Sequence, residues 1–295
     1  MSGQGQHVVI LGAGHAGGTA AALLRQYGHE GPITLIGEEP IPPYQRPPLS
    51  KAWLKGEADA DSLALKPLEF YAEHAIDFRP NVRAVAINRG AKTVALSDGA
   101  AVAYDALIIA TGARAIALPI PGADLKGVMF LRTAADAETL KATVGPGKRL
   151  AVVGGGYIGL EVAASGRALG AEVVVLEREA RLLARVACEA LSSFFKTQPE
   201  QHGVALELGA TAVAFEGVDG PNGGHVTGVR LADGRLVACD AVVVGVGAAP
   251  NDEIATDCGL ETARGVVVDL EARTSDPAIF AIGDVAHRPM PIYGR

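Results

Sequence analysis

The sequence is poor in cysteine, and the cysteines that it has share no motif. Among 295 residues only Cys188, Cys239 and Cys258 occur, and no two of them have the CxxC spacing of zinc sites and redox dithiols. Cysteines that form neither a metal-ligand set nor a disulfide framework are typical of a reducing compartment. We therefore expect no metal site and a cytoplasmic protein.

Long apolar runs and a surplus of basic residues are also missing. No apolar run approaches the ~18 residues that a membrane-spanning helix requires. The N-terminal residues, MSGQGQHVVI, are polar and lead straight into a predicted strand, so we expect no signal peptide. A net charge of −7 argues against a nucleic-acid-binding surface spread over the protein. The sequence thus predicts neither membrane nor nucleic-acid partners.

Glycine and aliphatic residues are abundant instead. The chain has 37 glycines, a hydrophobic content of 49% and a charged fraction of 20%, with only 5% aromatics. These values fit a folded protein with many close backbone approaches, as in α/β proteins that bind cofactors. The length exceeds that of one average domain and suits two or three.

Two segments of the chain follow the same plan. Residues 7–11 form an apolar run that ends in a glycine turn, followed by an alanine-rich stretch and a second apolar run at 33–36. Residues 149–176 repeat this order of strand, glycine turn, helix and strand. Each segment therefore predicts a βαβ unit of a parallel sheet.

A second repeat has a constant spacing. The turn residues Asp98 and Gly99 match Asp233 and Gly234, and Gly112 and Gly247, which follow the next strand in each copy, lie the same 135 residues apart. Asp-Gly between short alternating runs is typical of a β-hairpin turn. We infer an α/β fold with two related Rossmann-like dinucleotide-binding domains.

The order of the repeats predicts that one domain is inserted into the other. We expect residues 1–118 to form the first part of one domain and residues 119–246 to form the inserted domain. Residues 247–295 then return to the first domain, chiefly through the run 265–284.

The first glycine turn has the dinucleotide-binding spacing Gly12-x-Gly14-x-x-Gly17. The first glycine permits a tight turn, the second lets the backbone approach a pyrophosphate, and the third lets the helix pack on the strand. The amides at the helix N-terminus favour phosphate. Glu38, with Glu39 beside it, follows the next strand and is expected to bind ribose hydroxyls.

The second glycine turn is Gly154-x-Gly156-x-x-Gly159, and its acidic residue is Glu177. A carboxylate here favours NADH, because it repels the 2′-phosphate of NADPH. Arg178 follows directly, at a usual position for a 2′-phosphate ligand, and leaves NADPH as the alternative.

Two further motifs resemble those of the FAD-dependent pyridine nucleotide reductases, which have the glutathione-reductase-like fold. They are Ala110-Thr111-Gly112, at the end of the strand at 105–110, and Ile282-Gly283-Asp284 near the C-terminus. The resemblance implies FAD in the first domain and a nicotinamide cofactor in the inserted one, near Gly247. It also implies that Asp284 hydrogen-bonds the ribityl chain of the flavin.

The segment YQRPPLSK at 44–51 narrows the resemblance. The disulfide reductases of this family carry a redox CxxxxC after the first βαβ unit, whereas this chain has no cysteine before Cys188, which excludes a thiol relay. The segment is similar to that of the ferredoxin reductases of oxygenase systems, the putidaredoxin reductase and dioxygenase reductase type. The match extends to Leu131-Arg132-Thr133 and to the run that contains Glu161.

By that resemblance, further residues contact the cofactors. The expected FAD contacts outside the glycine turn and the two motifs above are Ala16, Arg46, Lys51, Val82 and Arg132. The expected NADH contacts outside the second glycine turn are Tyr157, Ile158 and Arg185. Lys51 and Glu161 are expected to pair at the flavin and act in catalysis, although a surface ion pair of little consequence is the alternative.

The activity implied is electron transfer from NADH through FAD to a [2Fe–2S] ferredoxin that feeds a P450 or a Rieske dioxygenase. The alternatives are a related flavin subunit with another acceptor, of the NADH oxidase or nitrite reductase type, and a non-catalytic nucleotide-binding fragment. Family members continue beyond the second motif into a C-terminal α+β domain. We therefore expect that domain to be absent and the chain to be truncated.

Overall fold

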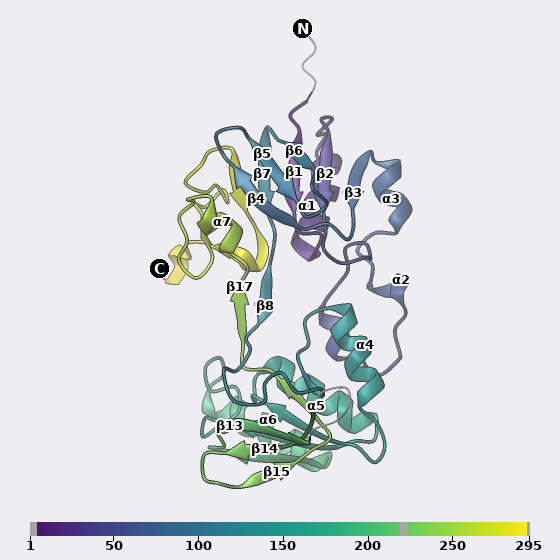
Figure 1. Ribbon diagram of the computed structural model, residues 1–295, viewed down its shortest axis with the longest axis vertical. Coiled ribbons are helices and arrows are strands. Elements are labelled where there is room, and N and C mark those ends of the chain that lie inside the picture. Colours follow the sequence, from purple (N-terminus) through teal and green to yellow (C-terminus); the bar gives the residue numbers. More distant parts are fainter. Residues whose placement is uncertain (1–4, 219–223, 294–295) are drawn as a thin grey trace. The chain divides into compact units, whose positions relative to one another are not determined.

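Two five-stranded parallel sheets organise the chain, one in each of two compact units (Figure 1). The computed structural model describes residues 5–218 and 224–293. The first unit comprises Met1–Gln45, Ala60–Arg114 and Ala249–Arg295, and the second comprises Arg46–Asp59 and Ala115–Ala248. Strands β8 (Ala113–Ala115) and β17 (Ala248–Pro250), which pair with each other, contain two of the four points where the chain passes between units.

The sheet of the first unit has the strand order β19-β7-β1-β2-β3. Its strands are β19 (Ile279–Ala281), β7 (Ala106–Ile109), β1 (Val8–Leu11), β2 (Ile33–Ile36) and β3 (Ile76–Arg79), and every neighbouring pair is parallel. All four residues of β1 and of β2 are buried, as expected of parallel strands that are covered on both faces.

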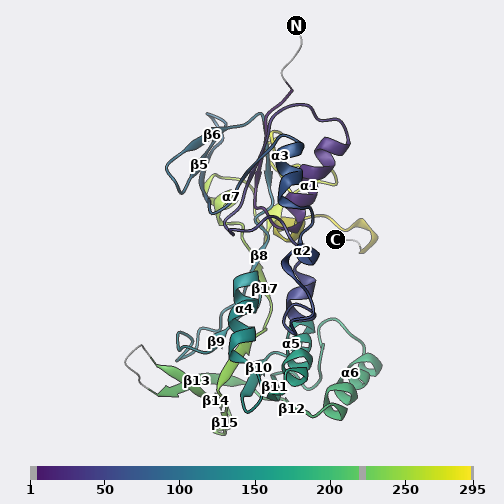
Figure 2. The same ribbon diagram turned by 90° about the vertical axis from the view of Figure 1, so that its right-hand side faces the viewer.

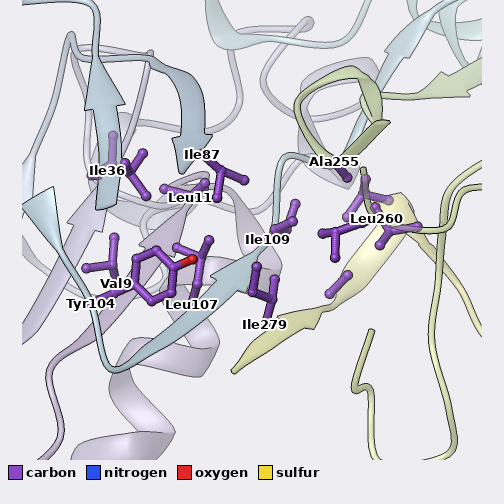
Figure 3. Packing of buried hydrophobic residues seen from close by; sticks show 14 of the residues in the cluster. Val9, Leu11, Ile36, Ile87, Tyr104, Leu107, Ile109, Ala255, Leu260 and Ile279 are labelled. Atoms are coloured by element: carbon purple, nitrogen blue, oxygen red, sulfur yellow. The ribbon is translucent and has the colours of Figure 1, made fainter. Parts of the chain in front are cut away.

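Alternate residues of β1 enter different cores. Val9 and Leu11 pack against a three-stranded antiparallel sheet, as Figure 3 shows for this cluster. That sheet consists of β4 (Ala84–Asn88), β5 (Thr93–Leu96) and β6 (Ala101–Ala103). Val8 and Ile10 belong to the opposite core with residues of α1 (His15–Gln26) and α3 (Leu68–Glu73). Figure 2 shows these two helices within the first unit. The unit therefore has three layers.

The remaining elements of the first unit are short. They are α2 (Ala60–Leu63), α7 (Glu253–Asp257), the paired strands β18 (Val266–Val267) and β20 (Ala286–His287), and the 3-10 turns η2 (Gly283–Val285) and η3 (Pro291–Tyr293).

The second unit repeats this architecture around the strand order β9-β16-β10-β11-β12. Its strands are β9 (Val128–Met129), β16 (Ala241–Val244), β10 (Arg149–Val153), β11 (Glu172–Glu177) and β12 (Val204–Leu208). One face packs against the antiparallel strands β13 (Ala212–Val218), β14 (His225–Leu231) and β15 (Leu236–Ala238). The other elements are the helices α4 (Ala134–Thr143), α5 (Tyr157–Ala168) and α6 (Glu189–Gln201) and the 3-10 turn η1 (Pro47–Ser50). The α/β fold with two Rossmann-like units, one inserted in the other, is thus confirmed.

The predicted hairpin turns are present in both units with the same hydrogen bond. The N–H of Gly99 donates to Leu96 and that of Gly234 donates to Leu231, each at 3.0 Å. Both glycines have positive φ, 87° and 90°, a backbone conformation that side-chain-bearing residues rarely adopt. The 135-residue repeat therefore extends to backbone geometry.

The segment 46–59 joins the second unit, whereas the sequence placed it in the first domain. Leu54 is fully buried in the core beneath α4 and α5. The Ser165 hydroxyl, on α5, donates to the backbone carbonyl of Ser50 at 2.7 Å. Burial of Leu54 and this hydrogen bond give a physical reason for the location of the segment.

Within the described residues, no helix is long and apolar enough to span a membrane. A shallow cavity of about 550 Å³ lies in the first unit between the C-terminal half of α1 and the strands β7 and β19. Leu24, Ile108 and Phe280 are among its lining residues. It lies away from the glycine turn at the start of α1.

Candidate functional site

Both glycine turns lie where the order of strands reverses. In the first sheet the chain leaves β1 through α1 to reach β2, while β7 lies on the other side of β1. In the second sheet β10 lies between β11 and β16 in the same way. In open α/β sheets such a reversal leaves a crevice at the carboxyl ends of the strands, where ligands bind.

Two glycines of the first turn, Gly12 and Gly17, have no room for a β-carbon. Gly12 has a φ of 109°, and a β-carbon on it would lie 2.3 Å from the carbonyl oxygen of Ala110. A β-carbon on Gly17 would lie 1.9 Å from the carbonyl oxygen of Gly12. Gly14 is the N-cap of α1 and so provides no capping side chain, and the first turn of the helix contains no acidic residue. The amides of that turn are therefore suited to an anion.

The other predicted residues of the first site follow neighbouring strands at the same edge. Ala110, Thr111 and Gly112 follow β7, and Asp284 follows β19 and is exposed. A β-carbon on Gly283, just before Asp284, would lie 2.7 Å from the β-carbon of Ala16. The two motifs and the start of α1 therefore lie side by side in the first unit.

Glu38, Glu39 and Val82 lie at the β2–β3 side of this edge. Glu38 is exposed, whereas Glu39 is half-buried and accepts a hydrogen bond from the Tyr44 hydroxyl at 2.7 Å. The N–H of Val82 donates to the carbonyl of Gly37 at 2.9 Å. Glu38 is thus the carboxylate that projects into solvent beside the turn.

Asn251 is a residue of this site that the sequence reasoning missed. Its side-chain amide donates to the Thr111 carbonyl at 2.9 Å, and its backbone N–H donates to Gly112 at 2.9 Å. The Thr111 hydroxyl donates to the Asn251 carbonyl at 2.7 Å. Asn251 fixes the Ala110–Gly112 turn; its place four residues after Gly247 was the one available signal.

The second turn repeats the first. Gly154 has a φ of 111°, and a β-carbon on it would lie 2.5 Å from the carbonyl oxygen of Gly245. A β-carbon on Gly159 would lie 2.0 Å from the carbonyl oxygen of Gly154. Gly156 differs, because a β-carbon there would meet no described atom within 4 Å. The space above Gly156 is what a closely approaching pyrophosphate requires.

Glu177 ends β11 and is bound to the glycine turn. One carboxylate oxygen accepts the N–H of Gly155 at 2.6 Å, and the other accepts the N–H of Glu179 at 2.8 Å. These two bonds fix the carboxylate beside the start of α5. A carboxylate still has acceptor capacity for ribose hydroxyls after two such bonds.

The remaining residues predicted to bind NADH lie in the same unit. Tyr157 and Ile158 begin α5 and are exposed by 55% and 44%. The guanidinium of Arg185 donates to the carbonyl of Val246 at 3.4 Å, next to Gly247, whose φ is 134°. Exposed apolar side chains at the start of a helix suit a ligand that covers them.

Lys51 and Glu161 form an ion pair, and Ser50 hydrogen-bonds the carboxylate of that pair. The Lys51 ammonium lies 2.7 Å from a carboxylate oxygen of Glu161, and the Ser50 hydroxyl donates to that same oxygen at 2.6 Å. Lys51 is 49% exposed and Glu161 is 30% exposed. Ser50, which is buried, was missed by the sequence reasoning although it lies inside the segment that the reasoning singled out.

Arg46 and Arg132 also meet in the second unit. The Arg46 guanidinium donates to the backbone carbonyl of Arg132, and Asp136 accepts the backbone N–H groups of Arg132 and Thr133 at 3.0 and 2.8 Å. Thr133 in turn caps α4 by accepting the N–H of Asp136. Arg46, Lys51 and Arg132, predicted to contact FAD, therefore belong to the unit that carries the second glycine turn.

The donor sets of both turns fit a dinucleotide. Each combines a glycine turn with positive φ, a helix of 12 residues whose N-cap is glycine, and an acidic residue after the next strand. The helix N-terminus suits a pyrophosphate and the carboxylate suits ribose hydroxyls. Two such sites are present in one chain.

Comparison with known proteins agrees with this geometry. Residues 6–294 match the family described as pyridine nucleotide-disulphide oxidoreductase. The chain is 51% identical over 288 residues to a probable ferredoxin reductase of Castellaniella defragrans, covering 98% of this chain and 69% of that protein. It is 43% identical over 279 residues to a rubredoxin-NAD(+) reductase of Pseudomonas putida, covering 95% and 71%.

A solved structure is similar over the same range. The covalent putidaredoxin reductase–putidaredoxin complex matches with a TM-score of 0.93 and 38% identity, covering 98% of this chain and 70% of the matched chain. The sheet order, the paired glycine turns and the extent of these matches all indicate membership of the same family. The chain belongs to the pyridine nucleotide-disulphide oxidoreductase family.

Proposed function

We propose that the chain is a flavoprotein reductase that passes electrons from NADH through FAD to a [2Fe–2S] ferredoxin serving an oxygenase. The observation that carries this proposal is the presence of two dinucleotide-type glycine turns in a chain with the Lys51–Glu161 pair. Similarity to the probable ferredoxin reductase of Castellaniella defragrans and to putidaredoxin reductase in its complex with putidaredoxin supports the choice of acceptor.

In this proposal the first unit holds FAD. The amides at the start of α1 bind the pyrophosphate, Glu38 binds the adenine ribose, and Asp284 binds the ribityl chain. The support is that Ala110–Gly112 and Gly283–Asp284 lie at the same sheet edge as the first glycine turn. Arg46, Lys51 and Arg132 are the further flavin contacts that the family resemblance implies.

The second unit holds NADH. The amides at the start of α5 bind its pyrophosphate, and Glu177 accepts hydrogen bonds from its adenine ribose. Tyr157, Ile158 and Arg185 lie along the bound nucleotide. The open space above Gly156 supports this assignment.

Lys51 and Glu161 act on the flavin in this proposal. A flavin bound here would supply the redox chemistry, accepting a hydride from NADH and passing on its electrons one at a time. The Lys51 ammonium stabilises negative charge that develops on the flavin edge, and Glu161 holds the ammonium in position. The buried Ser50 hydroxyl fixes the carboxylate of Glu161 through its hydrogen bond.

An absorption experiment tests the proposal. The chain is purified, supplied with FAD and freed of unbound flavin, and its spectrum is recorded without oxygen before and after NADH is added. We expect a bound-flavin spectrum that NADH bleaches, and subsequent reduction of a [2Fe–2S] ferredoxin by excess NADH in the presence of a catalytic amount of the protein. Bound flavin that NADH does not bleach would identify a nucleotide-binding protein without turnover.

Another acceptor is the second candidate function. The rubredoxin-NAD(+) reductase of Pseudomonas putida is 43% identical to the chain, so rubredoxin is the acceptor to compare. A kcat/KM for rubredoxin above that for every [2Fe–2S] ferredoxin tried would favour it. Rapid NADH oxidation with no added carrier, accounted for by oxygen consumption in the ratio for water or hydrogen peroxide formation, would instead indicate an NADH oxidase.

We place the protein in the cytoplasm, where NADH is available. Cys188, Cys239 and Cys258 are all free thiols, which agrees with a reducing compartment. Activity confined to the soluble cytoplasmic fraction of fractionated cells is the expected result.

A further inference from the structure

Three consecutive charged residues lie at the end of β11, beside the second glycine turn: Glu177, its last residue, followed by Arg178 and Glu179. Glu177 is held by the N–H groups of Gly155 and Glu179. Arg178 is exposed by 72%, and Glu179 by 47%. The hydrogen bond from the backbone N–H of Glu179 to the Glu177 carboxylate closes a tight turn that brings the three side chains to one end of β11. The turn therefore carries two carboxylates and one guanidinium, with a net charge of −1.

The guanidinium of Arg178 is directed to Glu179. Two of its nitrogens lie 3.0 and 3.3 Å from one carboxylate oxygen of Glu179. The nearby arginines are held elsewhere: Arg181 donates to the carbonyls of Ala184 and Ala187, and Arg185 donates to Val246. Arg178 is thus the arginine closest in sequence to Glu177, the carboxylate proposed to bind the ribose. Its guanidinium is paired with a second carboxylate, that of Glu179.

We propose that Glu179 is a specificity-determining residue that keeps NADPH out by holding Arg178 away from the adenosine 2′-phosphate. The proposal rests on the proposed binding of NADH at this turn. A 2′-phosphate carries close to two negative charges, so it meets repulsion from Glu177 and Glu179 together. Arg178 would otherwise offer the fork of donors that binds phosphate well.

The role of the Arg178–Glu179 ion pair in cofactor choice would therefore not be revealed by measuring the stability of the protein. Both side chains are exposed, and exposed ion pairs contribute little to folding. The charge of Glu179, however, acts on any anion that approaches Arg178. Loss of the carboxylate should leave the backbone turn intact, because the bond to Glu177 uses the backbone N–H of residue 179.

The test measures binding of two ligands without turnover. Isothermal titration calorimetry compares ADP-ribose with 2′-phospho-ADP-ribose, for the wild-type chain, for Glu179→Gln and for Glu179→Gln combined with Arg178→Ala. Glu172→Gln is the matched control, since Glu172 is an exposed carboxylate at the opposite end of the same strand. Thermal melting of each variant verifies that it is folded.

We expect Glu179→Gln to raise the affinity for 2′-phospho-ADP-ribose roughly tenfold at low salt and to change that for ADP-ribose less than about twofold. The gain should disappear in the double variant and shrink with added salt. Glu172→Gln should leave both affinities unchanged.

Two results would overturn the proposal, and they differ in whether they also contradict the proposed nucleotide site. Wild-type binding of ADP-ribose with no gain in Glu179→Gln, or a gain that persists without Arg178, contradicts the role of Glu179 and leaves NADH binding in place. Failure of the wild-type chain to bind either ligand contradicts the role of Glu179 and the proposed nucleotide site together.

Discussion

The glycines of the second turn are small for different reasons. Gly154 and Gly159 have no room for a β-carbon, because backbone oxygens would lie 2.5 and 2.0 Å from it. Gly156 has room and an ordinary negative φ of −85°. The fold therefore requires glycine at positions 154 and 159, whereas only a bound ligand gives a reason for glycine at position 156.

Gly156→Ala is predicted to keep the fold and lose the ligand. The added methyl group should change the free energy of unfolding by no more than about 1 kcal/mol. It should weaken ADP-ribose binding roughly tenfold or more, because it occupies the space that the pyrophosphate needs. Calorimetry and thermal melting measure the two effects. Gly145→Ala is the control, since Gly145 also has open space and lies in the same unit; equal affinities in both variants would refute the assignment.

Lys51→Met tests the ion pair with Glu161. Because the pair is partly exposed, its loss should cost at most about 1 kcal/mol of stability. Flavin reduction by NADH should slow by about tenfold or more if the ammonium stabilises charge on the flavin, with FAD content unchanged. Stopped-flow absorbance measures the rate. Lys55→Met removes a comparable lysine, paired with Glu57, and should not slow reduction; a wild-type rate in Lys51→Met would leave the pair as a surface feature.

At the scale of secondary-structure elements, each unit has a similar hydrogen bond between the starts of two neighbouring strands of its parallel sheet. In the first unit the Asp105 carboxylate accepts the N–H of His7 at 2.7 Å. In the second unit Asp240 accepts the N–H of Arg149 at 2.9 Å and also binds its guanidinium at 2.9 Å. Each aspartate thus connects the start of one parallel strand to the start of its neighbour. The same backbone-to-aspartate hydrogen bond is therefore present in both units, and the second unit also has an ion pair between Arg149 and Asp240.

Asp240→Asn is predicted to destabilise the protein in a pH-dependent way. The hydrogen bond from the Arg149 side chain lowers the pKa of Asp240 from 3.8 to about 2. Because the folded pKa lies below the unfolded one, the stabilisation is complete above about pH 4 and is lost as the pH falls toward 2.

The expected loss in Asp240→Asn is about 1 kcal/mol at pH 7, a value reduced for solvent screening at a carboxylate that is one-third exposed. Urea denaturation at pH 7 and at pH 3 measures it, and the difference from wild type should be smaller at pH 3. Asp257→Asn, an exposed carboxylate at the end of α7, is the control. A difference that does not change with pH would contradict the role of the Arg149 pair.

At the scale of the whole molecule, each unit has its own five-stranded parallel sheet, its own hydrophobic cores and its own glycine turn. The glycine turns and acidic residues of the two proposed cofactor sites belong to different units, so substitutions at these residues should impair the binding of the two cofactors separately. Glu38→Ala should lose FAD, by roughly tenfold or more in affinity because the ribose hydroxyls lose a charged acceptor, and should keep ADP-ribose.

Gly156→Ala should show the reverse, with FAD retained and ADP-ribose lost. Flavin absorbance after gel filtration and calorimetry with ADP-ribose measure the two sites independently. Loss of FAD in Gly156→Ala with FAD retained in Glu38→Ala would exchange the two assignments.

Much of the fold could be predicted because its signals are local or periodic. The glycine turns, the apolar strands beside them and the 135-residue repeat each lie within short stretches of sequence. They predicted two related parallel sheets, and both sheets are present, with four neighbouring strands in the same order, β7-β1-β2-β3 and β16-β10-β11-β12. The fifth strand differs, because β19 follows the other strands in the chain and β9 precedes them. Four glycines that the turn pattern selected, Gly12, Gly17, Gly154 and Gly159, are positions where a β-carbon would clash with backbone atoms.

The sequence by itself determined the two nucleotide-type turns, their acidic residues and the family resemblance, because each depends on residues close together in the chain. Only the tertiary structure decided that segment 46–59 joins the second unit, where Leu54 is buried. It also decided that Ser50 meets Glu161 across 111 residues, and that Asn251 holds Thr111 across 140. Such contacts depend on how separate elements pack and on where each side chain points, and neither is encoded in local spacing.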